Sequence, residues 1–236
     1  MSTWEPHEVA CATCGHPIRA HLLKGMHITR LPEVKAAIRD GTFQVFPCPS
    51  CGTPTHIEKA TIYTDFDAGH HVGVELPSET DWVEAKARHR KVYDEAFVFG
   101  PPVAAELATR TLHRVVFGLR ALREKVLAWD AGLDDQLVEC AKLELLQAGS
   151  RSFTEESLRL VAVLAPGDHL LFARYGSAGP ASAGGSGRPE VVGHDLFLRE
   201  RYDALLARRE ELRSAYWWVF DDWFVDATHR LLYPGS

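Results

Sequence analysis

The chain has 236 residues, 46% of them hydrophobic and 25% charged, which is the composition of an ordinary globular protein with enough residues for a sizeable core. Its 26 Lys and Arg against 32 Asp and Glu leave a net charge of −6, which argues against a protein built mainly to wrap nucleic acid or to bind anionic membranes. Four of its five cysteines lie in two Cys-x-x-Cys pairs.

The N-terminus, residues 1–7, contains neither a basic nor an apolar segment, so the sequence predicts no secretory signal. No segment approaches the ~18 consecutive apolar residues that a membrane-spanning helix needs. We therefore expect a cytoplasmic protein with no membrane partner. In that reducing compartment, paired cysteines bind metals more often than they form disulfides.

The two pairs are Cys11-Ala12-Thr13-Cys14-Gly15 and Cys48-Pro49-Ser50-Cys51-Gly52. The spacing lets both sulfurs of a pair face one ion, and the glycine that follows can adopt the positive φ of a tight turn. Four thiolates at about 2.3 Å around Zn²⁺ form a closed tetrahedral site. The sequence therefore predicts one structural zinc ion bound by Cys11, Cys14, Cys48 and Cys51. A redox-active dithiol fits less well, because neither pair lies at a predicted helix N-terminus in a βαβ unit.

The residues around the two pairs predict a zinc-ribbon-like β module over residues 1–78 with one inserted helix. That helix is expected over 31–41, with Pro32 in its first turn and Gly41 at its end. Extended segments are predicted by apolar runs and alternation at 18–22, 26–28, 42–46, 55–58, 61–63 and 71–76.

The next segment, residues 79–175, is predicted to be helical and to end in a β-hairpin. A first helix is expected over 81–96, and a second over 103–130 carries a heptad-like stripe of Ala108, Leu112, Val115, Leu119, Leu122, Val126 and Trp129. That stripe is compatible with a homodimer helix, but about three heptads are few for a coiled coil, so packing inside one protomer is favoured. A third helix is predicted over 135–147, capped by Asp134.

Two apolar runs, 158–164 and 169–175, flank the turn signal Pro166-Gly167-Asp168 and predict the hairpin, although 155–164 is also compatible with a helix. Residues 176–190 are rich in Gly, Ser and Ala and predict a flexible loop. The C-terminal segment, 191–236, is predicted to be helical over 197–213 and 216–232, with a possible third strand of the hairpin at 191–192.

The last predicted helix is rich in aromatic residues and acids. Core packing explains the aromatic residues most simply, and the alternative is an interaction surface that includes Trp217, Trp218 and Trp223. Asp221, Asp222, Asp226 and His229 form the best carboxylate cluster for a possible second site.

Several motifs resemble the bacterial CpXC domain family, which is named for two Cys-Pro-x-Cys pairs. The resemblance rests on Cys11-x-x-Cys14, on Leu31-Pro32-Glu33-Val34 through Gly41, on Cys48-Pro49-Ser50-Cys51-Gly52 and on Tyr63-x-Asp65. It covers about residues 9–147, including similarity at 122–126 and 132–135, and extends more loosely to the rest of the chain. The first pair has Ala12 in place of proline, which leaves the metal ligands unchanged. The resemblance implies a zinc-binding bacterial module and supplies no catalytic residue.

The predicted fold class is α+β, with the zinc module followed by a mainly helical region. We expect a protein-binding or scaffold protein with an unidentified protein partner. Nucleic acid is not an expected partner, because residues 1–80 contain six Lys and Arg against nine Asp and Glu, and zinc with four thiolates adds further negative charge. The alternative function is an enzyme of unknown reaction that uses Asp222, Asp226 and His229.

Overall fold

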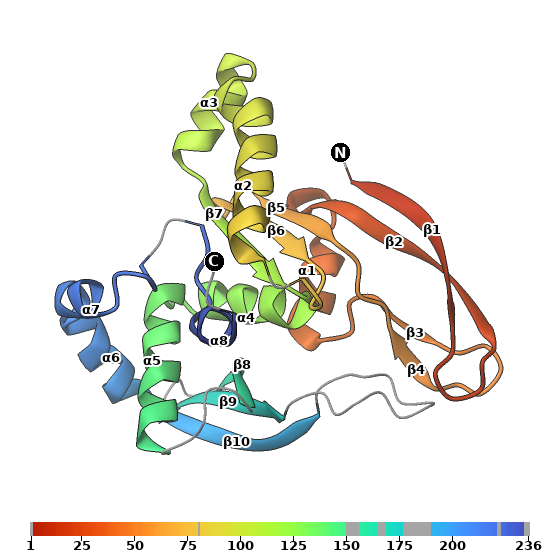
Figure 1. The fold of residues 1–236 in the computed structure, drawn as a ribbon. Coiled ribbons are helices and arrows are strands. Elements are labelled where there is room, and N and C mark those ends of the chain that lie inside the picture. The colour runs from red at the N-terminus through yellow and green to blue at the C-terminus, as the bar shows by residue number, and fades with distance from the viewer. Residues whose placement is uncertain are drawn as a thin grey trace. The chain divides into compact units, whose positions relative to one another are not determined.

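The computed structural model describes residues 2–79, 81–149, 156–164, 169–176, 190–220 and 223–233. The chain divides into two compact units, Met1–Leu122 and Arg123–Ser236. Both contain helices and strands, so the structure confirms a mixed α/β protein with several sheets (Figure 1). No helix in the described ranges is long and apolar enough to cross a membrane.

A five-stranded sheet is the centre of the first unit, with the strand order β1-β2-β5-β6-β7. These strands are β1 (Thr3–Ala10), β2 (Pro17–His27), β5 (Thr61–Asp65), β6 (His70–Glu75) and β7 (Leu112–Phe117). The β2–β5 and β6–β7 pairs are parallel, and the other two pairs are antiparallel. A separate two-stranded sheet pairs β3 (Val45–Pro47) with β4 (Pro54–His56). Most of these strands were predicted, but β1 and β7 were not.

The helices of the first unit are η1 (Ile28–Arg30), α1 (Pro32–Asp40), α2 (Trp82–Tyr93), the π-helix η2 (Asp94–Val98) and α3 (Pro102–Thr109). Helix α1 confirms its prediction: Pro32 lies in its first turn, and Gly41 ends it with a φ of 74°. Helix α2 is capped by Asp81, whose side chain accepts a hydrogen bond from the Glu84 backbone N–H. The end of α1 and the start of α2 thus follow from short local sequence signals.

The single helix predicted over 103–130 is wrong. The chain forms α3 there, then strand β7, and then α4 (Leu119–Asp130). Val115 and Val116 are fully buried in β7, and Gly118, with a φ of 82°, separates that strand from α4. A short apolar run fits a buried strand as well as a helix, and parallel pairing with β6 selects the strand here. The proposed homodimer helix is therefore not continuous.

The first unit also extends past residue 78, where the sequence placed the end of the metal module. Because β6 and β7 are parallel, the chain needs a long crossover between them, and α2, η2 and α3 form that crossover. The added strand makes residues 112–117 part of the N-terminal sheet.

The second unit packs helices on a three-stranded antiparallel sheet with the order β10-β9-β8. Its elements are the C-terminal part of α4, then α5 (Asp135–Ala148), β8 (Glu156–Leu164), β9 (His169–Gly176), β10 (Val191–Leu198), α6 (Arg199–Ala207), α7 (Arg209–Ala215) and α8 (Ala227–Leu232). The predicted hairpin and its third strand are confirmed, and 156–164 is a strand, not a helix. The predicted loop 176–190 lies, except for its end residues, outside the described residues.

The predicted helix over 216–232 is also wrong. Residues 216–220 form turns, and only Ala227–Leu232 are helical. Phe224 and Val225 are fully buried, and Asp226 adopts an extended conformation at the start of α8. The described aromatic residues of 216–224 therefore lie outside any helix, and their exposure ranges from Trp217 at 73% to the fully buried Phe224.

Candidate metal centre

The first cysteine pair lies in the turn between β1 and β2, directly after the last paired residues, Ala10 and Pro17. Cys11 N donates to His16 O at 2.9 Å, and Gly15 N donates to Cys11 O at 2.8 Å. Gly15 has a φ of 72°, which is the left-handed region that glycine enters without strain.

The second pair has the same geometry at the end of the other hairpin, where Pro47 pairs with Pro54. Cys48 N donates to Thr53 O at 2.9 Å, and Gly52 N donates to Cys48 O at 2.8 Å. Gly52 has a φ of 73°. Two hairpins far apart in the sequence thus end in turns of the same conformation, each presenting two sulfurs.

The four sulfurs converge on one point. Cys11 Sγ lies 3.7 Å from Cys51 Sγ, Cys14 Sγ lies 3.6 Å from Cys48 Sγ, and all four ligand atoms lie within 4.8 Å of one another. Tetrahedral zinc with Zn–S bonds of about 2.3 Å requires sulfurs about 3.8 Å apart. All four cysteines are free thiols, and their sulfurs are positioned to hold one metal ion.

The surroundings favour an ionised sulfur at Cys51 and oppose one at Cys14, where burial and the neighbouring cysteines raise the pKa of the thiol to about 11. Cys51 Sγ lies 3.3 Å from Thr53 Oγ1, and this hydrogen bond lowers the pKa of the Cys51 thiol to about 6. Cys11 and Cys48 are buried against Ile18, whereas Cys14 and Cys51 are exposed. A thiolate is the form that binds a metal, so the site loses a proton at Cys51 readily when an ion enters.

A substitution at Gly52 tests the role of its backbone conformation. No atom lies within 4 Å of the position that a Cβ would take, so any effect comes from the positive φ alone. We expect Gly52→Ala to lower the free energy of unfolding of the zinc-loaded protein by about 1–2 kcal/mol, and Gly52→Asn to cost less. Urea titrations of both variants measure this, and an equal or larger loss for asparagine would contradict it.

Comparison with protein families matches residues 9–142 to the CpXC protein family. The chain belongs to the CpXC family. The matched region contains all four cysteines of the CpXC metal centre and extends through β7 and α4 into α5. No curated protein and no solved structure matches this CpXC chain.

The structure also places the residues of the second, carboxylate-based site. Asp226 and His229 are buried, and Asp222 lies outside the described residues. Asp226 Oδ1 accepts a hydrogen bond from His229 N at 2.9 Å, which caps α8, and Asp226 Oδ2 lies 2.7 Å from Arg159 Nη1. The His229 ring packs against Phe224 and Tyr233. These contacts assign structural roles to Asp226 and His229.

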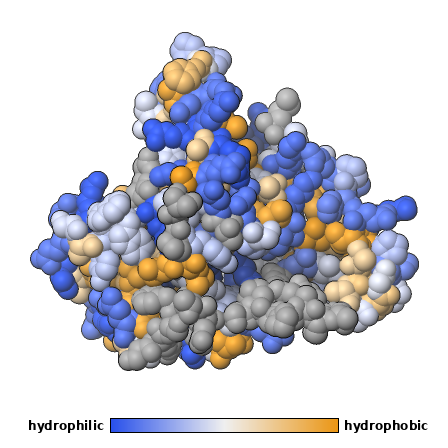
Figure 2. All heavy atoms as spheres, in the orientation of Figure 1, coloured by the Kyte–Doolittle hydropathy of each residue, from blue (hydrophilic) through white to orange (hydrophobic). Residues whose placement is uncertain are grey.

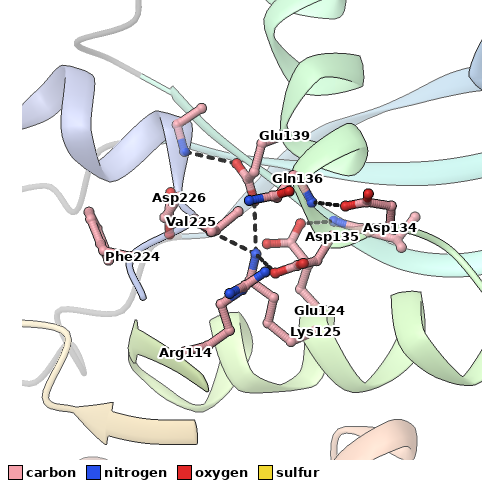
Figure 3. A network of polar contacts seen from close by, with 12 residues as sticks. Arg114, Glu124, Lys125, Asp134, Asp135, Gln136, Glu139, Phe224, Val225 and Asp226 are labelled. Atoms are coloured by element: carbon pink, nitrogen blue, oxygen red, sulfur yellow. Dashed lines mark hydrogen bonds and ion pairs between the residues drawn. The ribbon is translucent and has the colours of Figure 1, made fainter. Parts of the chain in front are cut away.

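Asp226 belongs to a buried ionic network that the sequence did not predict (Figure 3). Lys125 Nζ, from α4, lies 3.0 Å from Asp135 Oδ2 and 3.5 Å from Glu139 Oε1, and it donates to Val225 O at 2.6 Å. Lys125, Asp135 and Glu139 each expose 2% of their surface or less. Glu139 Oε2 accepts a hydrogen bond from Ala227 N at 2.9 Å. The network thus holds the backbone at the start of α8, at Val225 O and Ala227 N.

The same network continues through Lys142 and Glu124. Lys142 Nζ lies 2.8 Å from Glu139 Oε1 and 2.7 Å from Glu124 Oε2, and Arg159 Nη1 lies 3.1 Å from the same Glu124 oxygen. Glu124 Oε1 accepts a hydrogen bond from Leu160 N at 2.7 Å. Glu139 and Lys142 are three residues apart in α5, so they lie on the same side of the helix, among apolar residues. An acid and a base at this spacing on an apolar face are the sequence signal that could have indicated a buried ion pair.

The three tryptophans of the expected interaction surface differ in exposure. Trp217 is 73% exposed, Trp218 is partly buried against the core of the second unit, and Trp223 is 5% exposed. Trp217 is therefore the member of this set that is most accessible to a partner.

Proposed function

We propose that this CpXC protein is a bacterial, cytoplasmic, zinc-stabilised protein that binds protein partners or acts as a scaffold. The observation that carries the zinc assignment is the four-sulfur geometry, with Sγ–Sγ distances of 3.6 and 3.7 Å. Four thiolates fill the coordination sphere of Zn²⁺ and leave no position for a catalytic water. The metal would then be structural.

The small core around the two cysteine turns supports a structural role. Within the part of the chain that the structure describes, Cys11, Ile18 and Cys48 form a buried cluster, with Val9 and Phe46 packed against it. So few apolar side chains offset little of the entropy lost on folding. Structural zinc binding contributes on the order of 10–16 kcal/mol in small metal-dependent modules, which is enough to order both hairpins.

Exposed aromatic side chains support a binding role. Trp4 in β1, Phe99 after η2 and Trp217 after α7 are 54%, 79% and 73% exposed. Figure 2 shows hydrophobic residues near the tip of α2 and α3, above a largely hydrophilic helix surface. Large aromatic residues dominate the binding energy of many protein interfaces. The acidic metal module makes a nucleic-acid partner less favourable.

Cross-linking and affinity capture of the full chain from its native cells test the binding role. If Trp217 anchors a partner, we expect Trp217→Ala to reduce recovery of one specific protein about tenfold or more, which corresponds to about 1.4 kcal/mol. Leu206→Ala, at a 48% exposed position in α6, is the matched control and should leave recovery unchanged. Equal recovery of that protein by both variants would contradict a binding role for Trp217.

A further inference from the structure

The contact between α2 and the first sheet is made largely by polar rings. Thr64, His71 and His113 are register neighbours across β5, β6 and β7, so they form one row on one face of the sheet. His71 is 6% exposed, and its Nδ1 lies 3.1 Å from Thr64 Oγ1. This row faces the helix with one buried histidine, His71, and one half-buried histidine, His113, where apolar residues are usual.

Helix α2 adds a third histidine from the opposite side. His89 and Tyr93 are four residues apart and share one face of the helix. The His89 ring lies directly on Gly73, where a Cβ atom would overlap it, and His89 Nε2 lies 3.1 Å from Glu75 Oε1. The Tyr93 ring is centred 3.9 Å from the ring of His113 and 5.0 Å from that of His71.

The π-helix η2 completes the contact. Phe97 stacks on Tyr93 with the ring centres 4.7 Å apart, and it lies 5.8 Å from His71. A π-helix is rare and occurs frequently at functional positions. The apolar contribution is small: among the described residues of this segment, α2 buries Ala85 and Tyr93, and η2 and α3 contain no buried residue.

We propose that this contact is an acid-sensitive joint. The segment Trp82–Thr109, called the arm, stays on the sheet while His71, His89 and His113 are neutral. It is released when these histidines gain protons, and the strands of the first unit stay paired. Figure 1 shows that the arm leaves the sheet between β6 and β7, so its release does not require either strand to break.

Burial and like charge make protonation of these rings costly in the docked state. Burial lowers the pKa of His71 to about 3, with further lowering from the charges of His113 and His89. Burial, with the nearby Arg114, lowers the pKa of His113 to about 4. Burial also lowers the pKa of His89, although Glu75 opposes that shift. A histidine whose pKa is lowered in the docked state favours docking fully above pH 6.5, where the ring is neutral in both states. As the pH falls towards 4 and 3, the released state binds a proton more readily than the docked state, and this contribution is lost.

The charged groups around the joint do not offset this cost at His71. His71 faces Thr64, His113, His89, Tyr93 and Phe97. The carboxylates lie nearer to the other two rings: Glu75 contacts His89 and also Arg88 at 3.1 Å, and Asp94 acts on His113 together with Arg90 and Arg114. A positive charge on His71 is therefore repelled by His113 on the neighbouring strand and by His89 on α2 when these rings are protonated.

Hydrogen exchange of the zinc-loaded full chain between pH 7 and pH 4, corrected for intrinsic rates, tests the joint. We expect amides of residues 82–109 to lose protection more than tenfold per pH unit below pH 6, because opening binds more than one proton. Amides of β5 and β6 should keep their protection over the pH range in which zinc is still bound. Loss of protection by the arm and these strands together, or an arm that opens independently of pH, would overturn the proposal.

Variants separate the joint from the metal centre. His71→Asn keeps a polar atom at the Nδ1 position and removes the titration, so the arm's pH dependence should become shallower while the pH of zinc release is unchanged. His21→Asn, at an exposed position in β2, is the matched control and should not change either curve. If His71→Asn does not fold, NMR titration of the wild-type rings decides: midpoints below pH 5 for His71 and His113 support the joint, and midpoints near 6.5 overturn it.

Discussion

Cys48→Ser is expected to weaken zinc binding about 100-fold to 1,000-fold and to destabilise the first unit. The structural zinc contributes on the order of 10–16 kcal/mol, so an even share for one of four thiolates is about 2.5–4 kcal/mol. Cys48 is buried and lies 3.6 Å from Cys14 Sγ, and among the described residues the group of possible metal ligands here consists of the four cysteines. Competition with a chromophoric chelator measures the affinity, and urea unfolding of the same samples measures the stability.

Cys140→Ser is the matched control for that experiment. Cys140 is buried in α5 of the second unit, where burial raises the pKa of its thiol to about 12. The substitution places a hydroxyl in an apolar core and should cost stability, but it should leave the zinc affinity unchanged. A Cys48→Ser protein with the zinc affinity of the Cys140→Ser protein would contradict the assignment of Cys48 as a ligand.

Lys142→Met is expected to lower the stability of the second unit by about 3–5 kcal/mol. Lys142 is fully buried between Glu124 and Glu139, and its removal leaves two buried carboxylates with less cationic charge. Burial already raises the pKa of Glu139, so the variant should bind a proton there at higher pH than the wild type does. Chemical denaturation at pH 7 and at pH 5 measures both effects, and the stability loss should be smaller at pH 5.

An exposed ion pair provides the control for this second prediction. Glu144 Oε2 lies 2.8 Å from Arg201 Nη2, with about half of the arginine side chain exposed. Glu144→Gln should cost less than about 1 kcal/mol, because water and salt screen an exposed pair. If Lys142→Met costs no more than Glu144→Gln, the buried network does not stabilise the fold as described.

Elements with short local signals were predicted well. Helix α1 has Pro32 at its start and Gly41 at its end, and the two Cys-x-x-Cys-Gly turns have the positive φ that their glycines indicate. The four cysteines of the centre were likewise identified, because two pairs at this spacing leave few arrangements other than a metal site.

Elements whose identity depends on distant partners were not predicted. Strand β7 resembles a continuation of a helix in the sequence, and its parallel pairing with β6, about 40 residues earlier, decides its conformation. The buried network needs α4, α5, β8 and residues 224–227 to come together, and no window of the sequence contains that information. The histidine joint is hidden for the same reason, since His71, His89 and His113 lie on three separate elements.

The central claim is that the four cysteines form one closed structural zinc site. Metal analysis of the purified chain, followed by replacement with Co²⁺ and an absorption spectrum, tests it most directly. We predict one zinc ion per chain and a cobalt spectrum with the intense thiolate charge-transfer bands and visible bands of a tetrahedral four-sulfur site. A chain that folds without metal, or a cobalt spectrum typical of oxygen and nitrogen ligands, would contradict the account.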